Sequence, residues 1–136
     1  DIAQKFNNDF NVDDFFKMDK KSNYLLLSPI VKNRKGEFKK VLLNLVKKGF
    51  VRFRIDGEIV TSENIPELKK NIKHNIEVVV DRVFIDEKYK KRITQSIETA
   101  LNLSDGVIYF MIQRIKRIIY FLQNLLAQFQ VLQSMK

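Results

Sequence analysis

The sequence predicts a mixed α/β fold of the α+β type: a small mixed sheet of about four to five strands, two main amphipathic helices and a C-terminal helix. Three observations support this: an apolar run at Tyr24–Val31, a β-branched run at Ile76–Ile85, and two segments with helical spacing of apolar residues. Strands that alternate with amphipathic helices are typical of layered α and β structures. A chain of 136 residues forms one domain and buries roughly two-thirds of its unfolded surface.

The first half of the chain is predicted to form a short helix, a strand and a longer amphipathic helix. Residues 1–22 are polar and mixed, with one apolar cluster at Val12, Phe15 and Phe16, and a short helix is predicted there. Residues 24–31 suit a buried strand, and the loop KNRKGE at 32–37 follows. A helix is predicted from Glu37 to Lys48, with Gly49 placed to end it. Its apolar positions recur with helical spacing at Phe38, Val41, Leu42, Leu45 and Val46.

The middle of the chain is predicted to be mainly β-structure. Residues 50–56 alternate between apolar and polar side chains, as a half-buried strand does. Asp56-Gly57 is a strong hairpin signal that leads into a strand at 58–61. Residues 62–75 contain Pro66 and are predicted to form a loop with a helical turn, before the longest strand at 76–85.

The last part of the chain begins with a second amphipathic helix at about 88–103, which Ser104-Asp105-Gly106 ends. The segment GVIYF then begins a further strand. Residues 111–136 contain no acidic residue and have fair helical periodicity, so a helix is predicted there. Polar and charged residues interrupt its apolar run too early for a transmembrane span, whereas an amphipathic helix on a membrane surface remains an alternative.

Composition excludes several classes of site. The net charge of +9 and the pI near 9.8 favour an acidic partner. Without Cys there can be no disulfide framework, thiolate zinc site or cysteine nucleophile, and one His cannot form a multi-histidine metal site. The start of the sequence does not have the pattern of a signal or transit peptide. These features predict a soluble, intracellular, basic unit.

No catalytic or cofactor motif is found. His74 lies in a polar stretch without catalytic spacing around it, so a surface histidine is expected. Asp56 and Glu58 flank the hairpin glycine, where turn formation explains them better than acid–base chemistry. Asp81, with Asp86 and Glu87, lacks the ligand spacing of a calcium loop, and no phosphate-binding glycine motif is present. The sequence therefore predicts no enzyme and no bound cofactor or metal.

Arg52 and Arg82 are the most informative charged residues, because each interrupts an apolar β pattern. A guanidinium on a sheet face either pairs with a neighbouring carboxylate or binds a partner, and spacing alone leaves both alternatives open. The lysine pairs at 20–21, 39–40, 47–48, 69–70 and 90–91 are predicted to be solvated helix faces. Charge-driven binding of nucleic acid is the alternative function, although no known nucleic-acid motif supports it.

Four blocks in the same order resemble one segment of bacterial UvrA: LLLSPIVKNRKGEFKK, GFVRFRIDGEI, KKNIKHNIEVVVDRVFI and SIETALNLSDGVI. UvrA is the damage-sensing ATPase subunit of the nucleotide-excision-repair excinuclease, a cytoplasmic DNA-repair system. The resemblance implies a truncated UvrA whose residues 23–110 form the interaction domain that docks onto UvrB, without catalysis of its own. ATP, zinc and DNA would be bound by other parts of the parent protein. The resemblance also implies UvrB contacts at Arg52 and Arg82, with Arg54, Asp56, Glu58 and Asp81 as weaker candidates.

The resemblance is weak in residues 1–22 and stops after Tyr109. If A/T-rich codons are chosen from Phe110 onward and read one frame over, they spell YDTENKKNNIFSAKFACPVSGFTINE. This string contains FSAKFACP, where the family has an F-S-x-K-F-A-C-P segment. We therefore interpret residues 111–136 as an out-of-frame tail. The domain is expected to be monomeric unless this tail drives association.

Overall fold

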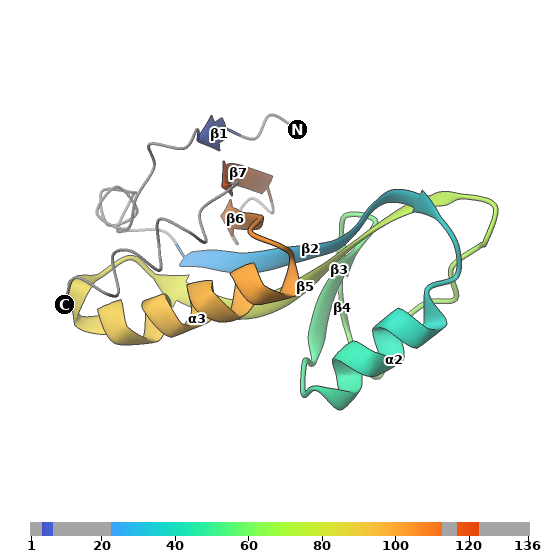
Figure 1. Cartoon of the computed structure of the whole chain (residues 1–136), viewed down its shortest axis with the longest axis horizontal. Helices are drawn as coiled ribbons and strands as arrows, with labels where there is room; N and C mark the ends of the chain where they lie inside the picture. Colours follow the sequence, from blue (N-terminus) through green and yellow to red (C-terminus); the bar gives the residue numbers. More distant parts are fainter. Residues whose placement is uncertain (1–3, 7–22, 113–116, 123–136) are drawn as a thin grey trace. The chain divides into compact units, whose positions relative to one another are not determined.

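The computed structural model describes residues 4–6, 23–112 and 117–122, which form seven strands, two α-helices and one short 3-10 helix (Figure 1). In chain order they are β1 (Gln4–Phe6), β2 (Asn23–Lys35), α2 (Lys39–Lys47), β3 (Arg52–Ile55), β4 (Glu58–Thr61), β5 (Lys73–Phe84), η1 (Glu87–Tyr89), α3 (Lys90–Leu103), β6 (Ile108–Ile112) and β7 (Arg117–Leu122). The strand order is β1-β7-β6-β2-β5-β3-β4. The pairs β2–β6, β6–β7, β3–β4 and β3–β5 are antiparallel, and β1–β7 is parallel, so the sheet is mixed. The predicted α+β class is confirmed.

The chain divides into two compact units. Unit 1 comprises residues 1–28 and 80–136, and unit 2 comprises residues 29–79. The long strands β2 and β5 each contribute one part to each unit. The candidate residues can therefore be placed within one unit or the other.

The core of unit 1 forms where α3 packs on the sheet. Ile93, Ile97, Ala100 and Leu101 recur with helical spacing along α3, and all are almost completely buried. The Ser28 hydroxyl of β2 donates a hydrogen bond of 2.9 Å to the carbonyl of Ala100, which satisfies a buried polar group beside this helix. The remaining members of this core are Tyr24, Leu26, Val83, Ile85, Ile108 and Phe110.

Unit 2 is organised by the hairpin of β3 and β4. Arg52 pairs with Thr61 and Ile55 with Glu58, so the two-residue turn between the strands is Asp56-Gly57. Both turn residues have positive φ, 49° and 88°, as a type I′ turn requires. Asp tolerates this conformation, and Gly adopts it without steric cost. The sequence signal for the hairpin and the bounds of β4 are both confirmed.

Most predicted elements are confirmed, with differences at the ends. The helix predicted at 37–48 is α2, the helix predicted at 88–103 is η1 followed by α3, and the long strand predicted at 76–85 is β5. The loop predicted from residue 32 is wrong for residues 32–35, which extend β2 as strand although all four are exposed. All four residues are polar, so the sequence shows no alternation of apolar and polar side chains there. A strand that is exposed on both faces therefore has the same sequence pattern as a loop.

The prediction of a helix from residue 111 is wrong for the tail residues that the structure describes. Met111 and Ile112 complete β6, and β7 pairs with β6 over five positions. Ile118 and Ile119 are β-branched, and the edge of β6 offers them backbone partners, so strand pairing prevails over helical periodicity. The remaining tail residues, and the helix predicted within residues 7–22, lie outside the described residues.

Candidate functional site

Arg52 and Arg54 point to the same face of β3 but have different environments. The Arg54 guanidinium Nη1 lies 2.6 Å from Oε1 of Glu77, which stands directly opposite in the β3–β5 register. The side chains of Arg54 and Glu77 are only 13% and 4% exposed. Arg52, two residues earlier, is exposed, and no described carboxylate pairs with it. Of the two arginines in this motif, Arg54 is committed to an internal ion pair and Arg52 is accessible.

The buried pair is electrostatically costly. Desolvation raises the pKa of the Glu77 carboxyl above its usual value, while the hydrogen bond and the charge of Arg54 oppose this rise. The Nε of Arg54 is buried, and no hydrogen-bond partner for it is found among the described residues. The pair therefore holds β3 to β5 and offers little of Arg54 to another molecule.

His74 is not on the surface: the prediction of a surface histidine is wrong. Its side chain is 6% exposed, because His74 shares the inward face of β5 with Ile76 and Val78. Nδ1 lies 2.6 Å from Oδ2 of Asp56, and Nε2 lies 2.7 Å from the carbonyl oxygen of Lys69. Both partners are acceptors, so the doubly protonated imidazolium satisfies both contacts. These two hydrogen bonds, with that to Asp56 contributing most, raise the pKa of His74.

Asp56 joins the hairpin turn to the start of β5. Besides its contact with His74, its Oδ1 accepts the backbone N–H of Asn75 at 2.8 Å. The expectation that turn formation explains Asp56 is consistent with this position, but its carboxylate also stabilises a histidine 18 residues away. Glu58, on the other side of Gly57, is exposed.

Asp81 is the centre of a second hydrogen-bond network, within unit 1. Its Oδ1 accepts the backbone N–H of Arg82 at 2.8 Å and Nη2 of Arg92 at 2.7 Å. Its Oδ2 accepts Nε of Arg92 at 3.1 Å and the hydroxyl of Ser96 at 2.8 Å. Burial by itself would raise the pKa of Asp81, but the hydrogen bonds from Arg92 and Ser96 outweigh burial and hold this pKa below its usual value. Asp81 thus ties β5 to α3.

Arg82 is exposed, and no described carboxylate pairs with its side chain. Val80 and Val83 both contact the core of unit 1 although they are three residues apart. Regular strand alternation would place them on opposite faces, so the alternation is broken at Asp81 and Arg82. Such a break is typical of a β-bulge, which redirects a side chain.

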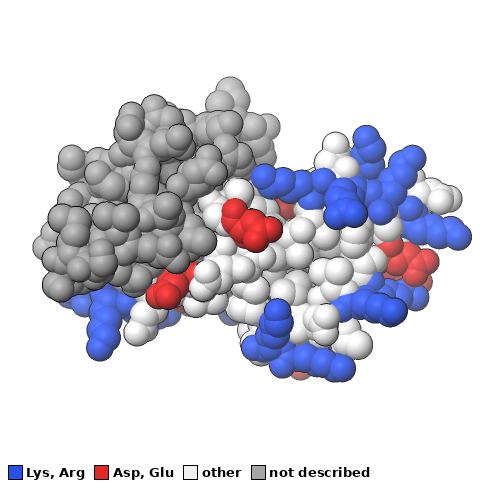
Figure 2. All heavy atoms as spheres, in the orientation of Figure 1, with Lys and Arg blue, Asp and Glu red and all other residues white. Residues whose placement is uncertain are grey.

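The structure thus places Arg52 in unit 2 and Arg82 in unit 1, both accessible, and commits Arg54, Asp56 and Asp81 to contacts within the chain. Positive charge is distributed unequally between the units. Unit 2, residues 29–79, contains 12 Lys and Arg against 6 Asp and Glu, a net charge of +6, whereas unit 1 contains the other 13 Lys and Arg against 10 Asp and Glu, a net charge of +3. Figure 2 shows Lys and Arg gathered over α2 and over the ends of β2 and β5 in unit 2. An acidic partner is therefore attracted mainly by unit 2.

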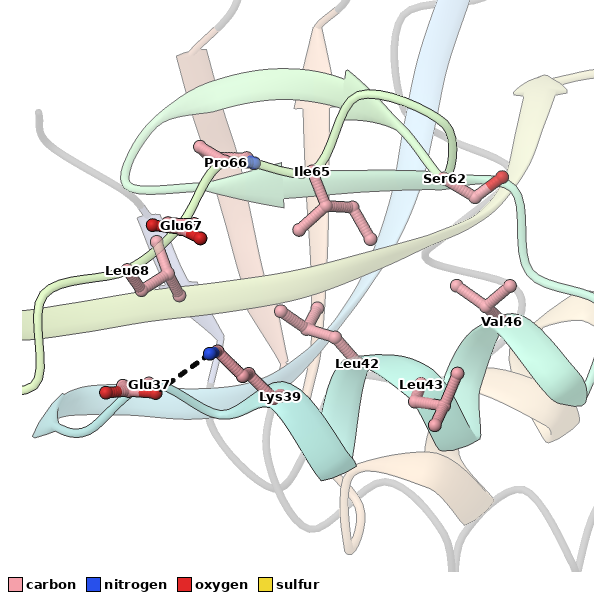
Figure 3. A pocket seen from close by; sticks show the side chains of 10 residues that line it. All are labelled: Glu37, Lys39, Leu42, Leu43, Val46, Ser62, Ile65, Pro66, Glu67 and Leu68. Atoms are coloured by element: carbon pink, nitrogen blue, oxygen red, sulfur yellow. Dashed lines mark ion pairs between the residues drawn. The ribbon is translucent and has the colours of Figure 1, made fainter.

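Unit 2 also has an apolar pocket of about 300 Å³ between α2 and the loop after β4 (Figure 3). Leu42 of α2 and Ile65 of the loop point toward each other across it. At its edge Lys39 Nζ lies 3.4 Å from Glu37 Oε2. The lining includes one hydroxyl, that of Ser62. The pocket is lined by Glu37, Lys39, Leu42, Leu43, Val46, Ser62, Ile65, Pro66, Glu67 and Leu68.

The part of the chain that the structure describes holds neither a metal-binding cluster nor a membrane-spanning helix. No three residues of the His, Cys, Asp and Glu types come together there in a way that could hold a metal ion, so these residues do not fit the zinc that the UvrA resemblance assigns to the parent protein. None of the helices there has the length and apolarity that a membrane crossing requires.

Comparison with known proteins shows the family of this chain. The family profile of the UvrA interaction domain matches residues 9–114. The chain belongs to the UvrA interaction domain family. UvrABC system protein A of Rickettsia prowazekii is 45% identical over 101 residues, which cover 74% of this chain and 11% of that protein. The corresponding proteins of Clostridium perfringens and Streptomyces coelicolor are 48% and 47% identical, over 71% of this chain and 10% of each relative. The chain thus spans about a tenth of the length of these relatives.

Sequence reasoning missed three residues of the interaction domain that determine its local geometry. Glu77 sits within a β-branched run, and the alternation of Arg52 and Arg54 around Phe53 could have indicated a carboxylate opposite them. Arg92 and Ser96 lie four residues apart on α3 and therefore share one face of the helix. The sequence does not indicate that this face meets Asp81.

Proposed function

We propose that this interaction domain docks onto UvrB as a non-catalytic module of nucleotide excision repair inside the cell, with Arg52 and Arg82 as contact residues. The observation that carries the proposal is the family match over residues 9–114. The domain needs no cofactor for this role, and the ATP and zinc of UvrA are assigned to parts of UvrA other than this domain.

The environments of the arginines support the choice of Arg52 and Arg82. Both are exposed on strands, and both lack an ion pair among the described residues, whereas Arg54 and Arg92 are held by Glu77 and Asp81. An accessible guanidinium can bind a partner carboxylate with two parallel hydrogen bonds. Loss of such a residue costs ~2–5 kcal/mol when its partner charge is left buried, which is about 30-fold or more in affinity.

The experiment measures the affinity of purified Clostridium perfringens UvrB for the whole chain and its variants by isothermal titration calorimetry. Arg52→Ala and Arg82→Ala should each weaken binding about 30-fold or more, with unchanged circular dichroism. Arg34→Ala and Lys91→Ala are matched controls, because each removes one exposed positive charge from unit 2 or unit 1. Equal binding by the parent and both arginine variants would refute the assignment of these contacts.

The net charge of +6 on residues 29–79 favours a second candidate function, direct binding of nucleic acid. Charge-driven binding falls steeply with salt and is little affected by any single substitution. Titration of duplex DNA at several salt concentrations therefore separates the two functions. Tight DNA binding whose affinity falls steeply with salt but is still measurable at physiological salt, together with no binding of UvrB, would favour the second.

A further inference from the structure

We propose that Asp81 is a positioning residue for Arg82, and that Arg92 and Ser96 of α3 keep Asp81 in this role. The inference rests on the proposed UvrB docking through Arg82. It assigns the acidic residue of the VVVDR block to the support of the contact, and not to the contact itself.

The first argument is that the Asp81 carboxylate is saturated. An ionised carboxylate has about four positions for hydrogen-bond donors. Asp81 fills them with four donors: Nε and Nη2 of Arg92, the Ser96 hydroxyl and the backbone N–H of Arg82. The side chain is also only 14% exposed. Asp81 therefore has no free acceptor position for a donor from a partner.

The second argument concerns competition for Arg82. Asp81 is adjacent to Arg82 in sequence and is an obvious candidate for an ion pair with its guanidinium. Arg92 occupies the carboxylate with a fork of two hydrogen bonds, so the Arg82 side chain is left accessible. Without Arg92, Asp81 would be free to pair with Arg82, and a docking partner would have to displace it.

The third argument concerns direction. The backbone N–H of Arg82 donates to Asp81 Oδ1 where the alternation between Val80 and Val83 is broken. This hydrogen bond fixes the backbone at the irregularity, and Ser96 and Arg92 fix the carboxylate to α3. The exposed direction of Arg82 is thus set by residues that lie 10 and 14 positions further along the chain.

A double-mutant cycle with UvrB tests this role. Asp81→Asn and Arg92→Ala should each weaken UvrB binding on the order of tenfold, and Ser96→Ala less. In an Arg82→Ala background the same substitutions should change affinity by less than about twofold, because they act through Arg82. Arg92→Lys retains the charge but loses the fork, so it should restore only part of the affinity. Asp86→Asn and Lys91→Ala serve as controls: each removes an exposed charge from unit 1 and should leave affinity unchanged.

Each outcome decides one point. Affinity losses that persist in the Arg82→Ala background overturn the inference, because they show that Asp81 or Arg92 acts independently of Arg82. Parent-like binding by Asp81→Asn and Arg92→Ala, with a weakened Arg82→Ala, overturns the inference and leaves the proposed function intact. Parent-like binding by Arg82→Ala itself overturns both. If Asp81→Asn fails to fold, Arg92→Ala and Ser96→Ala complete the cycle without it.

Discussion

Arg54 on β3 and Glu77 on β5 face each other in the sheet register and form an ion pair, with 2.6 Å between Nη1 and Oε1. The Glu77 side chain is 4% exposed and that of Arg54 is 13% exposed, so each charge is poorly solvated if the other is lost. Removal of one partner from such a pair is strongly destabilising, whereas replacement of both by apolar residues is often tolerated. The pair is a structural requirement of unit 2 that also prevents Arg54 from acting as a contact residue.

We predict that Arg54→Met destabilises the domain by ~3–5 kcal/mol, because it strands the Glu77 charge. The double variant Arg54→Met/Glu77→Leu should be less destabilised than the single variant. Arg52→Met is the matched control on the same face of β3 and should change the free energy of unfolding by no more than about 0.5 kcal/mol. Urea denaturation followed by circular dichroism measures all three. Equal free energies of unfolding for Arg54→Met and Arg52→Met would show that the ion pair does not stabilise the domain.

The second prediction concerns pH and His74. Its pKa is raised from 6.5 in the folded state, so its protonated form is favoured by folding. The stability gained in this way is fully present below pH 6.5 and is lost as the pH rises through the folded-state pKa. The melting temperature should therefore fall as the pH is raised above 6.5. His74→Gln should lose this slope, and since the chain has one His, no second imidazole can replace it. An unchanged slope in His74→Gln would contradict the Asp56–His74–Lys69 arrangement.

The third prediction concerns acid and two carboxyl groups with opposite behaviour. The pKa of Asp81 is lowered from 3.8, so its contribution to stability is present above that value and is lost as the pH falls through the folded-state pKa. The pKa of Glu77 is raised from 4.5, so acidification relieves the cost of burying its charge. Relative to the parent, the free energy of unfolding should fall less between pH 5 and pH 2 in Asp81→Asn. The Glu77 effect lies at higher pH, between 4.5 and the raised folded-state pKa, so on acidification towards pH 4.5 the free energy of unfolding of Glu77→Gln should lack the gain that the parent shows. Parallel curves for the three proteins would contradict both assignments.

The elements were predictable because their signals are local. The spacing of apolar residues located α2 and α3. The Asp56-Gly57 turn signal predicted both ends of β4 correctly. Long-range pairing was not predictable, since Asp81 meets Arg92 and Ser96 only after β5 and α3 have packed. His74 could have been placed inside by extending the alternation of Ile76 and Val78 two residues backward, because that alternation defines the inward face of β5.

The fourth prediction concerns the reading frame of the tail. We propose that the residues after Tyr109 are translated one frame away from the frame of the family. The gene should then contain, one base out of frame after the Tyr109 codon, codons that spell FSAKFACP. Sequencing of this stretch of DNA tests the proposal directly. Stop codons in that frame, or the absence of this string, would show that the tail is an independent sequence.

The last prediction concerns where the folded domain ends. Phe110 and Met111 are 0% and 1% exposed. In the pairing of β6 with β2, Phe110 lies opposite Leu26 and Met111 lies opposite Leu25. Loss of a buried Phe side chain alone costs ~3–5 kcal/mol. A chain that stops at Tyr109 should therefore lose cooperative thermal unfolding, whereas a chain that stops at Ile112 should keep it, because all of β6 is retained. The second chain exposes β6 as an edge strand, so its solubility should be compared with that of the whole chain. If the chain ending at Ile112 also fails to unfold cooperatively, the pairing of β7 with β6 is essential, and the residues beyond Ile112 belong to the folded domain whatever their reading frame.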